Sequence, residues 1–343
     1  MIVLGIETSC DETSVSIVEK NRNSLGGKVL SESTLSQINK HKVFGGVVPE
    51  LASREHSNVL HSLVKHTLKK SKLNLCKIDG FAATTGPGLL GGLLVGSNYA
   101  KGLALSQNKP FIPVNHLQGH ILVSRMKENV NFPFLCLLAS GGHTQILIAD
   151  NFNKFKLLGE TIDDALGEAF DKTAKVLGYS YPGGPIIEKL ALRAKKKSFS
   201  LPRPLIKEKN CNFSFSGLKT SVRRIVEKGI SQSSKKELAH EFQNSVVDCL
   251  MVKTERALKI FKKKYNQNGS LVFSGGVASN KFIKSKISKL CFNLGVKFFV
   301  PDSKLCVDNA TMIAWTGIEK LCNGEKNHSL KITPKPRWDL SNL

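Results

Sequence analysis

Two histidines four residues apart, His116 and His120, are the pair whose type and spacing most directly suggest chemistry. The apolar run 111–114 predicts a buried strand, and the pattern after it predicts a helix that begins near His116. Residues at i and i+4 of a helix differ by only about 40° around the axis, so both imidazoles can approach one point. Such a pair is typical of a metal site, although two unrelated histidines on an exposed turn can share this spacing.

The same spacing occurs in zinc proteases, which need a Glu directly after the first His as the general base. Leu117 occupies that position here, so peptide hydrolysis is the least favoured function. Two histidines also leave a metal short of ligands, and the third must come from a distant part of the chain. The candidate is Asp308, in the segment 306–314 that begins a predicted helix.

Two similar strand–turn–strand segments suggest that the chain is built from two related halves. Residues 2–18 carry the acidic pair Asp11 and Glu12 in their turn, and residues 134–149 carry Ser140, Gly141 and Gly142 in theirs. Small hydroxyl and glycine residues in such turns can present backbone N–H groups to a phosphate, while carboxylates can hold a cation. Two such loops aimed at a common cleft would form a phosphate clamp of the actin, hexokinase and Hsp70 kind.

Further glycine-rich turns are candidates for close helix packing or for binding a ligand. Residues 86–96 enter a helix but lack the Gly-Lys-Ser/Thr of a Walker A loop, so helix packing is the favoured interpretation. Residues 274–280 follow a strand with a Gly-Gly turn that can accept a nucleotide, and Asn280 could reach its ribose or base. Asp171 lies deeper along its predicted helix than the acids of the first turns, so the helix dipole accounts for it less well. Gly184 lies in a turn where backbone can approach a ligand.

The surrounding pattern predicts two lobes. The first covers 1–131 with the histidine helix, and a C-terminal helix at about 310–343 packs back on it. The second covers 132–309 with the nucleotide and substrate loops and a basic insertion at 195–231, which places the metal between the lobes. Histidines 56, 61 and 66 are five apart and do not converge, so we expect them at the surface or facing a partner. The last residues, 331–343, have prolines and no pattern, which predicts a loosely held end.

Composition restricts the class of protein. The 343 residues suffice for two domains of ordinary size, and 41% are apolar. No apolar run approaches the ~18 residues that a membrane helix needs, and no secretory or organellar leader is evident, so the cytoplasm is expected. The eight cysteines form no C-x-x-C pair and lie mostly in apolar runs, as reduced core residues do.

A net charge of +23 favours a polyanionic partner through phosphate neutralisation, although lysine-rich solvated faces would give the same number. Nine of the 50 lysines and arginines fall within the 30 residues 195–224. The candidates for a nucleic-acid contact are Lys195, Lys196, Lys197, Arg203, Lys219, Arg223 and Arg224. Phe199, Phe213 and Phe215 lie among them and could support bases or simply pack.

Ten stretches occur in the order found in one family. They are GIETSCDET, GGVVPELASREH, TGPGLLGGLLVG, NHLQGH, LASGGHTQ, DDALGEAFDKTAK, YPGGP, FSFSGLKT, SGGVASN and DNATMIA. Together they resemble the bacterial tRNA N6-adenosine threonylcarbamoyltransferases (TsaD, formerly Gcp) over nearly the whole chain. Departures are small: Gln118 stands where many members have Glu, and Ala139 where Val is common.

The resemblance implies an α/β, two-domain actin-like ATPase fold (a duplicated RNase H-like fold) with a central cleft. It implies transfer of threonylcarbamoyl from threonylcarbamoyl-AMP to N6 of adenosine 37 in tRNAs that read codons beginning with A, with release of AMP. Partners would be tRNA, a TsaB-like paralogue and a TsaE-like ATPase. One divalent metal ion, iron or else zinc, would be held by residues that match His116, His120 and Asp308.

Further residues match the family's substrate contacts and its first acidic loop. The substrate set is Leu138, Ala139, Ser140, Gly141, Gly142, Asp171, Gly184 and Asn280. Asp11 and Glu12 match the acidic loop and are the catalytic candidates. The alternatives are an ATP-hydrolysing or phosphotransferase enzyme of the same fold, and a non-catalytic RNA-binding scaffold.

Overall fold

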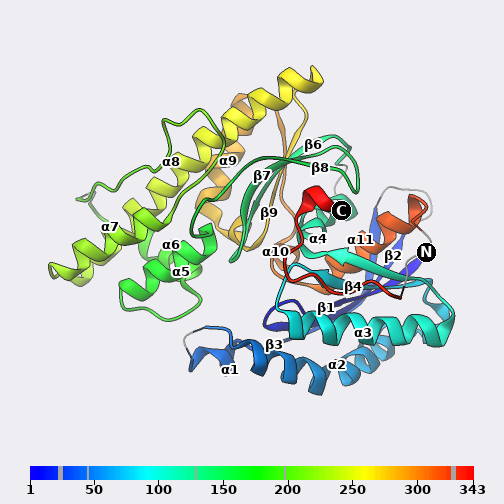
Figure 1. The fold of residues 1–343 in the computed structure, drawn as a ribbon. Coiled ribbons are helices and arrows are strands. Elements are labelled where there is room, and N and C mark those ends of the chain that lie inside the picture. Colours follow the sequence, from blue (N-terminus) through cyan, green and yellow to red (C-terminus); the bar gives the residue numbers. More distant parts are fainter. Residues whose placement is uncertain (22–25, 45, 128–129, 197, 326–329) are drawn as a thin grey trace. The chain divides into compact units, whose positions relative to one another are not determined.

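Two five-stranded sheets form the framework, each within its own compact unit (Figure 1). The computed structural model describes residues 1–21, 26–44, 46–127, 130–196, 198–325 and 330–343. The first unit contains Met1–Asn131, Asn151–Lys154 and Val307–Leu343, and the second contains Phe132–Asp150 and Phe155–Cys306. Asp308, which the sequence assigned to the second lobe, is therefore grouped with the histidine helix in the first unit.

The first sheet has the order β3-β2-β1-β4-β5. Its strands are β1 Ile2–Glu7, β2 Glu12–Lys20, β3 Gly27–Ser36, β4 Gly80–Gly86 and β5 Phe111–Asn115. β1, β2 and β3 pair antiparallel, whereas β4 and β5 run parallel to β1. The carboxyl ends of β1, β4 and β5 consequently lie at the same edge of the sheet.

The central strand β1 is buried on both faces, as its continuous apolar sequence requires. Side chains alternate along a strand, and Leu4 and Ile6 point into a cluster with residues of α2 and α3. Gly5 points to the other face, where a Cβ would lie 2.5 Å from the carbonyl oxygen of Ala310. The glycine thus lets α11 lie directly on the sheet.

The described residues of the first unit form five α-helices. They are α1 Ile38–Lys42, α2 Pro49–Ser71, α3 Leu90–Gln107, α4 His116–Leu122 and α11 Ala310–Cys322. Short 3-10 helices cover Leu75–Lys77, Val123–Met126 and Leu340–Asn342. The C-terminal helix was predicted to continue to 343, but it ends at Cys322, and the described residues 330–343 form turns and irregular chain before the 3-10 helix Leu340–Asn342.

The C-terminal stretch, residues 331–343, is held by hydrogen bonds to residues in and next to the first sheet. The N–H of Lys335 donates to the Thr85 carbonyl at 2.7 Å, and the N–H of Gly88 donates to the Pro336 carbonyl at 3.1 Å. The Trp338 carbonyl accepts a hydrogen bond from Asn115 Nδ2 at 2.9 Å. The prediction of a loosely held end was wrong, because these backbone partners are distant in sequence and leave no local pattern.

The second sheet, β10-β9-β6-β7-β8, repeats the strand order and directions of the first. Its strands are β6 Phe134–Ala139, β7 Thr144–Ala149, β8 Phe155–Glu160, β9 Ser270–Ser274 and β10 Lys297–Phe299. Its α-helices are α5 Leu166–Val176, α6 Gly183–Ala191, α7 Ser216–Glu227, α8 Gln232–Tyr265, α9 Lys281–Asn293 and α10 Ser303–Cys306, with a 3-10 turn at Gly276–Ser279. The two halves are therefore built on one plan.

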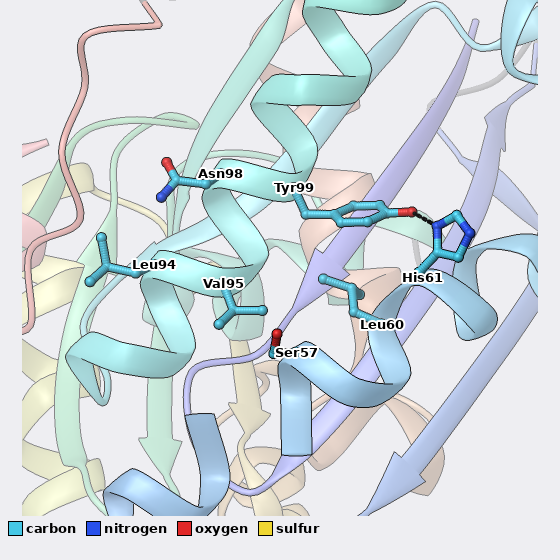
Figure 2. Close-up of a pocket in the computed structure, with 7 residues that line it drawn as sticks. All are labelled: Ser57, Leu60, His61, Leu94, Val95, Asn98 and Tyr99. Atoms are coloured by element: carbon cyan, nitrogen blue, oxygen red, sulfur yellow. Dashed lines mark hydrogen bonds between the residues drawn. The ribbon is translucent and has the colours of Figure 1, made fainter. Parts of the chain in front are cut away.

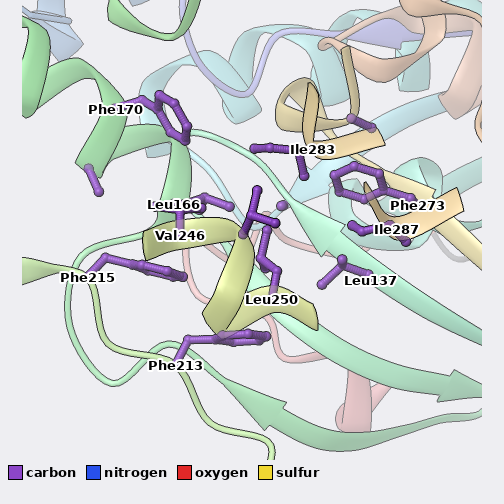
Figure 3. Packing of buried hydrophobic residues seen from close by; sticks show 14 of the residues in the cluster. Leu137, Leu166, Phe170, Phe213, Phe215, Val246, Leu250, Phe273, Ile283 and Ile287 are labelled. Atoms are coloured by element: carbon purple, nitrogen blue, oxygen red, sulfur yellow. The ribbon is translucent and has the colours of Figure 1, made fainter. Parts of the chain in front are cut away.

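The core of the second unit joins this sheet to its helices (Figure 3). Leu137 of β6 and Phe273 of β9 lie in one cluster with Val246 of α8. Phe213 and Phe215 are buried in the same cluster with their rings stacked, 5.8 Å between centroids. They support packing and cannot reach a nucleic acid base, which decides between the two roles that the sequence left open for them.

All eight cysteines are free thiols, and five of them are buried as expected. Cys76 and Cys322 are exposed and Cys10 is half-buried, so the core interpretation does not hold for these three. None of the helices in the described part of the chain combines the length and apolar content that crossing a bilayer requires.

The first turn of α4 should depend on Asn115. Its Oδ1 accepts the N–H groups of Leu117 and Gln118, and its Nδ2 reaches the C-terminal stretch. Asn115→Ala removes this N-cap and should lower the free energy of unfolding by about 1–2 kcal/mol. Urea denaturation measures it, with the exposed helix residue Asn98 changed to Ala as the control. Equal stability of the two variants would contradict the capping role.

Candidate metal centre and substrate loops

The two histidines of α4 lie side by side and are buried. His116 and His120 are 8% and 0% exposed, and their ring centroids are 4.8 Å apart with the planes nearly perpendicular. Asn115 fixes the start of the helix at His116, as described above. The i, i+4 spacing therefore brings both imidazoles to one region.

Asp308 completes the cluster from the segment before α11. Its Oδ1 lies 3.4 Å from Nε2 of His116 and 3.2 Å from Nε2 of His120. One ligand atom from each of the three residues lies within 4.8 Å of the other two. Two imidazole nitrogens and one carboxylate oxygen are donors that transition metals accept, so this cluster could hold a metal ion.

The electrostatics of the cluster show how strongly it favours positive charge. Burial alone would lower the pKa of His116, but the carboxylates of Asp308 and Glu7 outweigh it and hold that pKa well above its usual value. Burial would likewise raise the pKa of Asp308, but the two imidazoles hold it well below its usual value. A proton on His116 thus balances the carboxylates where a bound cation would do the same.

A buried carboxylate that the sequence reasoning did not assign lies behind His116. Oε2 of Glu7 is 3.1 Å from His116 Nδ1, and the Thr84 hydroxyl donates to the same oxygen. The N–H of Ser9 donates to Oε1 of Glu7 at 2.6 Å. The only signal in the sequence is an acidic residue at the end of the otherwise apolar strand 2–7, which alone does not reveal its partner.

The first acidic loop is held by a buried histidine. His56 of α2 lies 2.8 Å from the Thr13 hydroxyl through Nδ1 and 3.0 Å from the Cys10 carbonyl through Nε2. His56 is fully buried, so its expected surface position was wrong, whereas His61 and His66 are exposed. The amphipathic spacing did not predict this, because the buried partner of His56 is a polar loop rather than an apolar face.

Asp11 and Glu12 are both half-buried in this loop. Burial raises the pKa of Glu12 to about 7, with the negative charges of Asp308, Asp11 and Glu7 adding to the effect. The glycine-rich start of α3 packs against the same loop, since a Cβ on Gly92 would lie 2.2 Å from the Thr8 carbonyl oxygen. The expected packing role of these glycines thus applies to a loop as well as to a helix.

In the second unit, the predicted substrate loop is the turn after β6. Leu138 and Ala139 are buried strand residues, whereas Gly141 and Gly142 are exposed and their missing side chains would meet nothing. Ser140 closes the turn, because its N–H donates to the His143 carbonyl and its Oγ accepts the His143 N–H. The two glycines therefore offer open backbone to a ligand.

Two further predicted contacts have structural partners of their own. Asp171 Oδ1 accepts the N–H of Gly183 at 2.6 Å, which fixes the turn that carries Gly184. Asn280 caps α9 by accepting the N–H of Ile283, and its Nδ2 donates to Gln243 at 3.1 Å. Asp171 and Asn280 thus order the backbone around the proposed substrate contacts.

The cations of the basic segment 195–231 differ in whether they are exposed or paired with a carboxylate. Arg203 pairs with Glu241 and Asp248 of α8, and this arrangement fixes the loop before α7. Lys195, Lys196 and Arg224 are exposed, while Lys197 lies outside the described residues.

Two other cations of this segment lie on α7. Lys219 and Arg223 line a hollow of about 500 Å³ with Lys172 and Lys175 of α5. Asp163 holds the start of α7 by accepting the N–H groups of Phe215 and Ser216. The cations of α7 therefore lie on an anchored helix.

A second hollow, of about 370 Å³, lies between α2 and α3 (Figure 2). Its lining is Ser57, Leu60, His61, Leu94, Val95, Asn98 and Tyr99. His61 Nδ1 lies 2.9 Å from the Tyr99 hydroxyl across it. None of the predicted catalytic, metal or substrate residues lines this hollow.

Comparison with known proteins identifies the family. The family model described as tRNA N6-adenosine threonylcarbamoyltransferase (TsaD) matches residues 28–315. The chain is 48% identical to the proteins of that name from Brucella suis and Brucella ovis, over 345 residues that cover 99% of this chain and 95% of each relative.

Solved structures agree with the fold. Component A of the (R)-2-hydroxyglutaryl-CoA dehydratase of Acidaminococcus fermentans aligns with a TM-score of 0.53 at 15% identity, covering 94% of this chain and 99% of that one. Full-length HypF aligns with a TM-score of 0.61 at 15% identity, covering 95% of this chain and 56% of that one. The predicted actin-like ATPase fold class is confirmed, and the chain belongs to the tRNA N6-adenosine threonylcarbamoyltransferase family, TsaD.

Proposed function

We propose that this chain transfers the threonylcarbamoyl group from threonylcarbamoyl-AMP to N6 of adenosine 37 in tRNA, and that AMP is released. Family membership over nearly the whole length supports the transfer. The convergence of His116, His120 and Asp308 is the structural observation that carries it, because these side chains could hold a metal ion and Leu117 stands where a zinc protease needs its Glu.

In the proposed reaction, N6 attacks the carbamoyl carbon, the bond from that carbon to the phosphate oxygen breaks, and N6 loses a proton. A metal bound by the three ligands would supply Lewis-acid polarisation and orientation of the donor. The exposed backbone at Gly141 and Gly142 would hold the adenylate phosphate and favour its departure. We assign the proton to Glu12, with Asp11 beside it, because both are half-buried carboxylates of the first loop and a positioned carboxylate can act as a general base.

The two alternatives account for less. A phosphotransferase of the same fold would use the loops but has no need for two buried imidazoles facing a carboxylate. A non-catalytic RNA scaffold would use the charge but gives no reason for the same cluster. The transferase proposal gives a role both to the cluster of His116, His120 and Asp308 and to the exposed cations of the basic segment 195–231.

Cofactor and partners follow from the same proposal. Two imidazoles and one carboxylate suit iron or zinc, and iron is our first choice. We place the reaction in the cytoplasm with tRNA, a TsaB-like paralogue and a TsaE-like ATPase.

The metal ligands can be tested by removing one of them. His116→Ala should abolish stoichiometric metal binding and lower the transfer rate by at least about 100-fold, since the loss of one of three ligands opens the site. Mass spectrometry of tRNA nucleosides, after incubation with threonylcarbamoyl-AMP and the partner proteins, measures the product. His66→Ala makes the same change at an exposed position and should keep full activity. Full activity of His116→Ala would exclude the metal from the reaction.

The cations of α7 should contribute to tRNA affinity. Arg223→Ala with Arg224→Ala should weaken tRNA binding about tenfold at moderate salt and reduce its salt dependence, because two phosphate contacts are lost. Lys262→Ala with Lys263→Ala removes the same charge from exposed positions on α8 and is the control. Filter binding over a salt series measures both. If both double variants weakened tRNA binding equally, the loss would come from the change in net charge and not from contacts of α7 with tRNA.

Glu12 should make stability depend on pH in the metal-free chain. Its folded pKa of about 7 exceeds its usual 4.5, so its contribution is complete below pH 4.5 and is lost as the pH rises through 7. The stability of the native chain relative to Glu12→Gln should therefore fall across this range, by on the order of 2 kcal/mol after allowance for solvent screening. Urea unfolding at pH 4.5, 6 and 8 measures it, with Glu19→Gln at the other end of β2 as the control. If the difference in unfolding free energy between the native chain and Glu12→Gln did not change with pH, the pKa of Glu12 would not be raised in the folded chain.

A further inference from the structure

The carboxylate behind His116 is placed by three adjacent strands. Glu7 ends β1, and Thr84 follows directly the residue of β4 that pairs with Ile6. β5 pairs with β4 on the other side and leads into His116. The register of the parallel strands thus brings Glu7, Thr84 and His116 to one edge of the sheet.

Both carboxylate oxygens of Glu7 accept hydrogen bonds from neighbouring groups. Oε1 receives the N–H of Ser9, and Oε2 receives the hydroxyl of Thr84. Glu7 is 1% exposed, so water does not compete for these oxygens. Its side chain therefore has one orientation, in which Oε2 also lies 3.1 Å from Nδ1 of His116.

The two nitrogens of His116 face different partners. Nδ1 faces Glu7, with the Ser9 hydroxyl also 3.2 Å away, whereas Nε2 faces Asp308. An imidazole that donates its Nδ1 proton to a carboxylate keeps the lone pair on Nε2, which is the nitrogen aimed at the other ligands. A second carboxylate behind the ring also raises its basicity as a ligand.

We propose that Glu7, held by Thr84, is a positioning residue that fixes the ring orientation and tautomer of His116 and thereby sets the affinity of the site for a divalent metal. The inference rests on the metal site of the proposed function. Glu7 acts through His116 and takes no part in the transfer itself. The chain thus carries a carboxylate–histidine–metal arrangement whose first member ends the central strand of the sheet.

The test measures metal affinity rather than transfer. Chelator-treated chain is titrated with Co²⁺, whose ligand-field absorption reports the geometry of the site, and with Zn²⁺ against a chromogenic chelator. Glu7→Ala should raise the dissociation constant about 10–100-fold, and Glu7→Gln should raise it less and alter the Co²⁺ spectrum. Thr84→Val should raise it several-fold, whereas Thr84→Ser keeps the hydroxyl and should bind as the native chain does.

Glu319→Gln is the matched control. Glu319 is another nearly buried carboxylate of the first unit, paired with Arg125 at 2.9 Å, and it lies near the far end of α11 from Asp308. This variant should lose stability but keep the native metal affinity within about twofold. A general effect of burying an amide would instead change Glu7→Gln and Glu319→Gln alike.

The outcomes separate this inference from the proposed function. Native affinity and spectrum in folded Glu7→Gln and Thr84→Val, with folding verified by circular dichroism, would overturn the positioning role and leave the metal site intact. If the Glu7 variants do not fold, the Thr84→Val and Thr84→Ser pair decides. A native chain whose Co²⁺ binding is absent, or is unaffected by His116→Ala, would overturn both the inference and the metal site.

Discussion

The meeting of three parallel strand ends is the constraint on which the candidate site depends. β1, β4 and β5 run in one direction, so the residues that follow or end them lie at one edge of the sheet. Glu7, Thr84 and His116 are more than a hundred residues apart at the extremes and are brought together only by this register. A shift of one residue in β1 would turn Glu7 to the opposite face of the sheet.

The position of Asp308, the third candidate ligand, depends on how closely α11 approaches the same sheet. Gly5 leaves room for the backbone of α11, and Gly119 of α4 lies where a Cβ would be 3.1 Å from the Met312 side chain. Asp308 precedes this helix by two residues and so reaches the histidines. Packing of this helix thus determines whether Asp308 joins the two histidines in the cluster.

The second unit uses the same strand plan for a different purpose. Its turn after β6 contains no ionisable group between Ser140 and Gly142, and it exposes glycine backbone instead. Asp171 orders the neighbouring glycine turn and Asn280 caps a helix beside it. One architecture therefore supplies a side-chain cluster in the first unit and backbone surfaces in the second, which fits the metal and adenylate roles that we propose for them.

The sequence by itself determined the family, the fold class, most strands and helices, and the residues that could bind a metal. These follow from local signals: apolar runs, glycine turns, the i, i+4 histidine spacing and ordered motifs. Tertiary structure alone decided that Glu7 stands behind His116, that His56 is buried against the first loop, that Arg203 is paired, and that the C-terminal stretch is attached to the sheet. Each depends on a partner more than thirty residues away, and hydrophobic periodicity carries no information about distant polar contacts.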